Sequence, residues 1–129
     1  MEYFLRISGK LDNLNDYTSA CRTNPYKGAQ MKRKNEAKVI TAILEQLKRL
    51  RIKKPVYMVY DWYEPNKRRD LDNISSFGRK VIQDALVETK VLANDSWRDI
   101  VGFQDNFYID TGNPRIEVTI KEVEKINER

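Results

Sequence analysis

Residues 55–62 form a continuous run of mainly apolar side chains, rich in β-branched and aromatic types. Such a run is typical of a strand at the centre of a sheet, and it is too short to span a bilayer. The chain has 129 residues, enough to bury one core without cross-links, and its only cysteine, Cys21, excludes an internal disulfide. We therefore expect a single domain over residues 1–129, built around this strand and not bound to a membrane.

Hydrophobic periodicity divides most of the remaining chain into strands and helices. Alternating apolar residues predict three further strands, over residues 3–8, 100–109 and 115–121, with Gly102 at a bulge. Apolar residues at three- and four-residue spacing predict two helices, over residues 29–50 and 73–89. Turn formers predict a loop over residues 10–28 and a hairpin joining the last two strands. The expected fold is α+β, a mixed sheet with two helices in the order β-α-β-α-β-β.

Charge is distributed unevenly along the chain. Residues 1–69 carry 16 Lys/Arg and 7 Asp/Glu, whereas residues 70–129 carry 8 and 12. A basic half of this kind binds polyanions, because neutralising phosphates releases counterions. A lysine-rich, solvated helix face explains the same pattern, so charge alone leaves nucleic acid and plain solvation as equal alternatives.

The sequence lacks histidine and lacks the layout of a signal peptide, which limits the possible catalytic groups and the expected cellular location. There is no histidine, so catalysis would have to use carboxylates, lysines, arginines, hydroxyls or Cys21. The first residues lack the basic-then-apolar layout of a signal peptide, so we expect a cytoplasmic protein.

The cations Lys67, Arg68 and Arg69 run directly into an acidic pair, Asp70 and Asp72. In an extended segment both carboxylates would face one side, where they suit Mg²⁺, or Mn²⁺ in its place. The same pattern also occurs in helix caps, with Asp72 or Asn73 as the cap, and in nucleotide-sugar transferases, which need a larger domain.

A third acid would strengthen the metal-site hypothesis. Asp95, in a polar loop, is the best candidate. Asp84 is less attractive, because its spacing from Lys80 indicates an ordinary i, i+4 ion pair.

These residues carry a resemblance to a known family. The segment Lys67–Asn73, then Asp84-Ala85-Leu86, then Asn94-Asp95, then residues 115–120 resemble the RusA family of Holliday junction resolvases, with phage and prophage members of Gram-positive hosts closest. The resemblance implies a homodimeric, Mg²⁺-dependent endonuclease that cuts four-way DNA junctions by paired symmetric nicks in recombination and repair. Asp70, Asp72 and Asp95 would then be the metal ligands.

The resemblance also implies a catalytic lysine, whose position is ambiguous. Counting forward from Asp72 gives Ser76, and counting back from Asp84 gives Lys80, which we favour. If Lys80 cannot reach the phosphate, Arg69 or another cation must offset the developing charge.

We expect DNA contacts from two regions. The first is the basic run before Asp70; the second is the N-terminal loop and the start of the first helix, with candidate residues Asn15, Tyr17, Arg22, Lys27, Lys32 and Arg33. A connector loop and a solvated helix face are the structural alternatives for that second region. A noncatalytic DNA-binding protein on the same scaffold is the alternative function. The predicted hairpin and the first strand are the candidate dimer interface.

Overall fold

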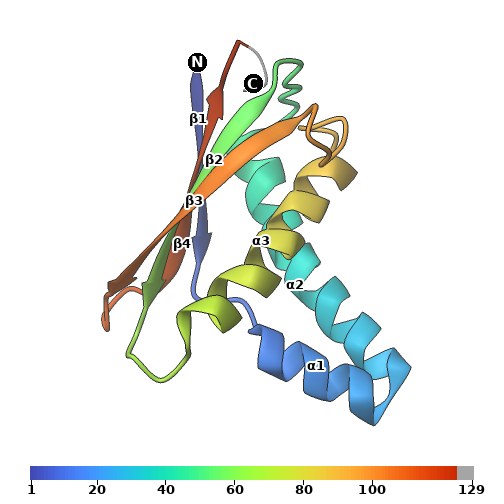
Figure 1. Ribbon diagram of the computed structural model, residues 1–129, viewed down its shortest axis with the longest axis vertical. Helices are drawn as coiled ribbons and strands as arrows, with labels where there is room; N and C mark the ends of the chain where they lie inside the picture. The colour runs from blue at the N-terminus through green and yellow to red at the C-terminus, as the bar shows by residue number, and fades with distance from the viewer. Residues whose placement is uncertain (125–129) are drawn as a thin grey trace.

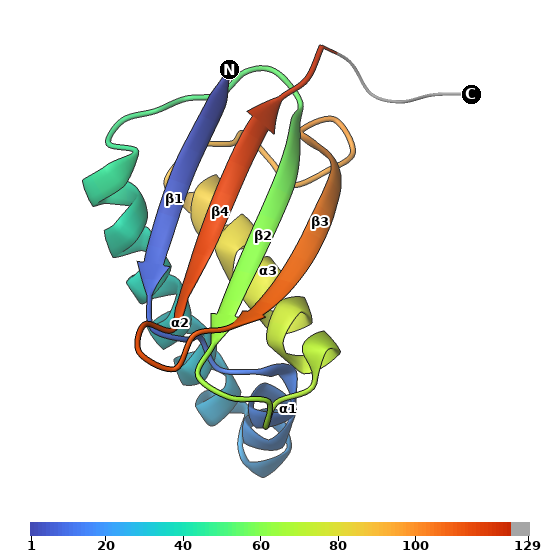
Figure 2. The same cartoon turned by 90° about the vertical axis from the view of Figure 1, so that its left-hand side faces the viewer.

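The computed structural model describes residues 1–124, which form a sheet and helices in two layers. The elements are β1 (Glu2–Ser8), α1 (Leu14–Thr23), α2 (Pro25–Gln46), β2 (Val56–Glu64), α3 (Leu71–Glu88), β3 (Ile100–Ile109) and β4 (Arg115–Glu122). The helices lie together on one side of the sheet (Figure 1), and Figure 2 shows the other face without a covering layer. The predicted α+β class with a mixed sheet is confirmed.

The segment predicted as a loop, residues 10–28, is instead largely helical. Asn13 caps α1, accepting a hydrogen bond from the Asp16 amide at 2.8 Å, and Asn24 caps α2 by accepting one from the Tyr26 amide at 2.8 Å. Asn24 is followed by Pro25 at the first helical position, where a missing N–H costs nothing. These amides and the proline are therefore helix-start signals, and the number of predicted helices was wrong.

The predicted hairpin between the last two strands is also wrong. The sheet order is β1-β4-β2-β3, so β2 lies between β3 and β4. β2 pairs in parallel with β3 and antiparallel with β4, so this largely apolar strand has a neighbour on both edges. The turn after β3 passes the end of β2 and is bonded to it, with the Asp110 amide donating to the Glu64 carbonyl at 2.8 Å.

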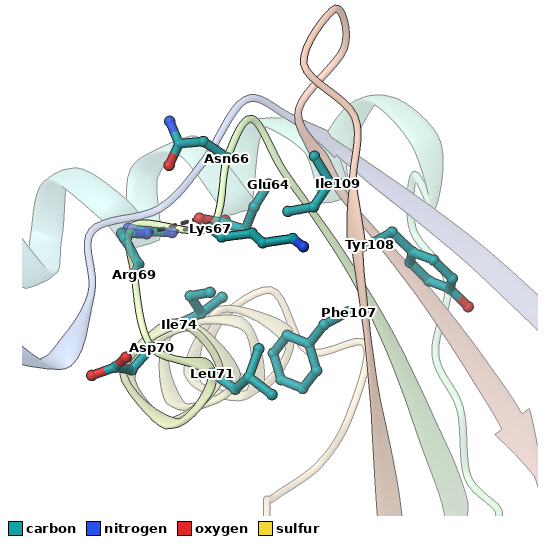
Figure 3. A pocket seen from close by; sticks show the side chains of 10 residues that line it. All are labelled: Glu64, Asn66, Lys67, Arg69, Asp70, Leu71, Ile74, Phe107, Tyr108 and Ile109. Carbon is teal, nitrogen blue, oxygen red and sulfur yellow. Dashed lines mark hydrogen bonds and ion pairs between the residues drawn. The ribbon is translucent and has the colours of Figure 1, made fainter.

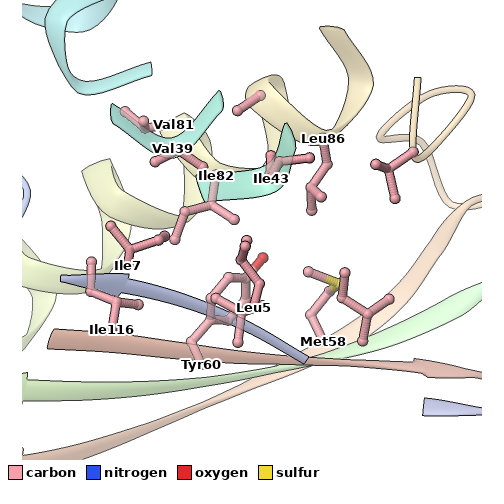
Figure 4. Packing of buried hydrophobic residues seen from close by; sticks show 14 of the residues in the cluster. Leu5, Ile7, Val39, Ile43, Met58, Tyr60, Val81, Ile82, Leu86 and Ile116 are labelled. Atoms are coloured by element: carbon pink, nitrogen blue, oxygen red, sulfur yellow. The ribbon is translucent and has the colours of Figure 1, made fainter. Parts of the chain in front are cut away.

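The core lies between the sheet and the helices. Alternate residues of β2, among them Met58, Tyr60 and Trp62, are buried against the helical layer, while the intervening residues are half-buried on the open face. Figure 4 shows Leu5 of β1 and Ile116 of β4 beneath residues of α2 and α3. The strand predicted at the centre of the sheet is thus central but covered on one face only.

α3 is the helix on the β3 side of the sheet. A Cβ atom at Gly78 of α3 would lie 2.6 Å from the Trp62 ring, so glycine permits the close approach of this helix to β2. The register between β2 and β3 shifts just before Gly102, which confirms the predicted bulge. Within the described residues, no helix is both long and apolar enough to cross a membrane.

Candidate active site

The paired aspartates lie at the N-terminus of α3. Asp70 is the N-cap residue, with extended backbone angles of φ −71° and ψ 148°, and Asp72 lies in the first helical turn. The prediction that both aspartates lie in one extended segment therefore holds for Asp70 alone. The prediction that Asp72 or Asn73 caps the helix is wrong, because Asp70 is the N-cap residue. Both carboxylates still project from the same end of the helix, where free N–H groups and the helix dipole favour negative charge.

Both carboxylates have unused hydrogen-bonding capacity. Asp70 and Asp72 are exposed, and Asp70 makes no capping bond to the helix backbone. Within residues 1–124, neither carboxylate forms an ion pair or a hydrogen bond. Ser76 Oγ does donate to Asp72, but to its backbone carbonyl oxygen and not to its carboxylate. Carboxylate oxygens that are free in this way are suitable ligands for a hard divalent cation.

The loop that presents Asp70 is held by a nearly buried ion pair. Arg69 Nε and Nη2 donate to the two carboxylate oxygens of Glu64, both at 2.9 Å, and Nη1 donates to the Leu11 carbonyl at 2.8 Å. The side chains of Arg69 and Glu64 are 16% and 8% exposed. Arg69 is thus engaged inside the protein, and it joins the end of β2, the loop before α3 and the loop before α1.

Lys67 and Arg68 differ from Arg69 in being exposed. In the described chain neither side chain has an acidic partner, and the Arg68 amide donates to Asn66 Oδ1 at 3.0 Å within this turn. A pocket of about 470 Å³ opens here, and both Lys67 and Asp70 line it. Figure 3 shows the Asp70 carboxylate directed away from the apolar side of this pocket, formed by Leu71 and Phe107. Exposed cations and exposed acids thus occur together in the segment from Lys67 to Asp72.

Lys80 and Asp95 form a second group, farther along α3. Lys80 Nζ lies 3.0 Å from Asp84 Oδ1 and 3.3 Å from Asp95 Oδ2, so the predicted Lys80–Asp84 pair is confirmed. The hydrogen bond that Lys80 donates to Asp84, together with the one that it donates to Asp95, raises the pKa of Lys80. Lys32 of α2 also contacts Asp84, at 3.0 Å. Lys80 is therefore a protonated cation bridging two carboxylates.

The two groups do not meet within one chain. Ten residues of helix separate Lys80 from Asp70, a rise of about 15 Å. The loop that carries Asp95 follows the far end of α3 (Figure 1). Among residues 1–124 no three acidic, histidine or cysteine side chains lie close enough together to hold a metal ion. Asp70 and Asp72 are brought together, and Asp95 is placed apart from them.

The other candidate DNA-contacting residues lie on the pair of helices α1 and α2. Asn15, Arg22, Lys27 and Arg33 are exposed. Tyr17 instead packs on Phe77, with ring centroids 4.8 Å apart, and Lys32 is paired with Asp84 and with Glu36. In this arrangement the first four are free to meet phosphates, whereas Tyr17 and Lys32 make internal contacts.

Glu64 is the site residue that sequence analysis missed. A signal for it exists, because Tyr60, Trp62 and Glu64 share the buried period-two face of β2. An acid on such a face requires a cation, and the nearest run of cations along the chain begins at Lys67.

A family of known proteins matches the part of the chain that contains these site residues. The family model described as Endodeoxyribonuclease RusA matches residues 13–121, which include both acidic groups, the loop that Arg69 holds, and the basic helices. No curated protein matches the chain significantly. Nucleases of this family generally depend on divalent metals. The chain therefore belongs to the RusA family of endodeoxyribonucleases, the Holliday junction resolvases.

Proposed function

We propose that this nuclease resolves four-way DNA junctions as a homodimer, by paired symmetric nicks, with Mg²⁺ or Mn²⁺ held by Asp70, Asp72 and Asp95. The role would be in DNA recombination and repair, in the cytoplasm. The observation that carries the proposal is the pair of unpartnered carboxylates at the start of α3, next to exposed Lys67 and Arg68. A divalent cation bound there would polarise the scissile phosphate and lower the pKa of an attacking water.

Asp95 lies apart from Asp70 and Asp72 in one chain, so the three carboxylates could bind one metal ion only if two copies of the chain contribute them. One chain supplies two of the three carboxylates at the N-terminus of α3 and carries Asp95 near its other end. We propose that each site takes Asp70 and Asp72 from one copy and Asp95 from the other. A dimer with two-fold symmetry then has two such sites, which suits a substrate that must be nicked in two opposed strands.

Lys80 has a distinct role in this scheme. Lys80 Nζ contacts the Asp84 and Asp95 carboxylates as a cation, so we propose that it serves as a fixed positive charge. Its contact with Asp95 means that both residues would enter the same site from the same copy. There Lys80 would offset negative charge on the phosphate in the transition state.

DNA is held through phosphates in this proposal. Lys67 and Arg68 are the phosphate contacts next to the acids, and Arg22, Lys27 and Arg33 extend the basic surface along α1 and α2. Arg69 is a positioning residue, because its guanidinium is used by Glu64 and Leu11.

The test separates DNA binding from cleavage. Asp70→Asn and Asp72→Asn should bind a synthetic four-way junction at least as well as the wild type, because negative charge near the phosphates is removed, yet should not cleave it at any Mg²⁺ concentration. Glu45→Gln, an exposed change on α2, is the matched control and should cleave normally. Full cleavage by Asp70→Asn, or cleavage by the wild type in the presence of EDTA, would contradict the proposal.

A further inference from the structure

The two edge strands of the sheet, β1 and β3, are protected to different degrees. On β1 the Gln46 side chain of α2 caps the backbone, accepting from the Arg6 amide at 2.7 Å and donating to the Arg6 carbonyl at 2.6 Å. No side chain among the described residues bonds to the backbone of β3 between Ile100 and Ile109. β3 is therefore the strand whose outer edge is open.

The hydrogen bonds between β2 and β3 show which backbone N–H and C=O groups of β3 point away from the sheet. The Asp110 amide points toward β2, where it donates to the Glu64 carbonyl. Because successive residues of a strand point to opposite edges, the even-numbered residues after the bulge point toward β2. The outward set of unpaired N–H and C=O groups belongs to Phe103, Asp105, Phe107 and Ile109.

The composition of β3 is unusual for an exposed edge. Natural sheets protect long edges with lysines, prolines or bulges, because a bare edge is a template for another strand. β3 has ten residues, and Asp105 is the only charged one. Its carboxylate is used internally by Trp62 Nε1, at 3.0 Å, and by Arg79. Phe103 and Ile109 are 48% and 49% exposed, so beyond the bulge at Gly102 the edge of β3 has no lysine or proline and carries exposed apolar side chains.

We propose that the outer edge of β3 is the surface through which two copies of this chain associate, by antiparallel pairing of β3 with β3 of the partner. The inference rests on the homodimer of the proposed function and names its interface. A two-fold axis makes the same strand complementary to itself, since antiparallel pairing satisfies each outward N–H and C=O with its own counterpart. The two four-stranded sheets then form one continuous sheet.

The position of α3 indicates a second copy as the occupant of this edge. α3 lies on the β3 side of the helical layer, where Arg79 contacts Asp105 and lies over the Phe103 ring at 4.4 Å. Antiparallel pairing of the strands sets the two α3 helices side by side in opposite directions. The Asp70 end of one helix then faces the end of the other that carries Asp95. This pairing thus supplies the third acid that is not found beside Asp70 and Asp72 among residues 1–124.

Cysteine cross-linking tests the interface without DNA or metal. In a Cys21→Ser background, single cysteines replace Gln104, Asn106 or Tyr108, whose side chains would form the close, non-hydrogen-bonded pairs across the axis. Cα atoms in such pairs are about 4.5 Å apart, within the reach of a disulfide. Under mild oxidation, at least one variant, alone or in a pairwise mixture, should become mainly a covalent dimer. Phe4→Cys on β1 is the control and should stay monomeric on a non-reducing gel.

Two further measurements make the result decisive. In the wild-type protein, amide hydrogen exchange at the outward residues, such as Phe103 and Phe107, should be slow and should become faster on dilution. Gln104→Lys should shift sedimentation toward the monomer, whereas Thr119→Lys, on the open face of β4, should not.

The outcomes also separate this inference from the proposed function. Absence of cross-links together with fast exchange at the outward amides would overturn the β3 interface, even if the protein cleaved junctions. Cross-linking at β3 in a protein that never cleaves a junction would instead support the interface and reject the function.

Discussion

Arg69→Ala should unfold far more easily than Arg68→Ala, although both remove one arginine from the same basic run. Arg69 makes three hydrogen bonds, at 2.8 to 2.9 Å, and two of them go to a Glu64 side chain that is 8% exposed. Removing Arg69 leaves that carboxylate buried without a partner, which typically costs about 3–5 kcal/mol. Arg68 is exposed and has no acidic partner among the described residues, so its loss should change stability by less than about 0.5 kcal/mol.

Urea denaturation measures the difference directly. Trp62 is 1% exposed and reports core unfolding by fluorescence, whereas Trp97 is 78% exposed and changes little. The double variant Glu64→Gln/Arg69→Met should be more stable than Arg69→Ala, because it leaves no unpaired buried charge. Equal unfolding midpoints for Arg69→Ala and Arg68→Ala would refute this account of how the loop before α3 is held.

Three further perturbations test other parts of the structure. Arg68→Ala should reduce the slope of log K against log salt for junction binding by about 1 without changing Tm, since it removes one phosphate contact; an unchanged slope would remove Arg68 from the DNA surface. Gly28→Ala should lower Tm, because its Cβ would lie 3.2 Å from Cys21 Cα and closer still to its sulfur, whereas Gly112→Ala meets nothing within 4 Å and should leave Tm nearly unchanged. Asp84→Asn should cost stability near neutral pH. Because Asp84 raises the pKa of Lys80 and Lys32, its contribution is present below their ordinary pKa of 10.5 and is lost as pH rises through the raised values. The Tm difference from the wild type should therefore shrink at alkaline pH, and a difference that stays constant would contradict the assignment.

Much of the fold could be predicted because periodicity reports burial directly. The alternation in β1 and β4 and the helical spacing in α2 and α3 are imposed by a core on one side of each element. The α1 helix has only ten residues, none of them buried, and turn formers are frequent in its sequence. Its start is marked by Asn13, which is equally common in turns, so composition indicated a loop where a capped helix forms.

Pairing of strands could not be predicted in the same way. A short polar turn such as residues 110–114 usually closes a hairpin, and nothing local shows that its ends are separated by β2. The choice depends on which strand most needs two neighbours, a property of the whole sheet.

The site shows the same division between local and long-range information. The acidic pair and the basic run are adjacent in sequence, so their proximity was predictable. The partner of Arg69 is Glu64, five residues earlier, and it is found only once the inward face of β2 is known. The place of Asp95 depends on the path of the chain after α3, which no local pattern describes.

Mixing two inactive variants tests most directly whether each site takes acids from two copies. Asp72→Asn and Asp95→Asn, each inactive alone, should regain nicking of one strand of a four-way junction when they are unfolded together and refolded as mixed dimers. A mixed dimer contains one site with all three carboxylates only if Asp95 acts across the interface. A refolded mixture that binds the junction but stays as inactive as either variant would contradict the account.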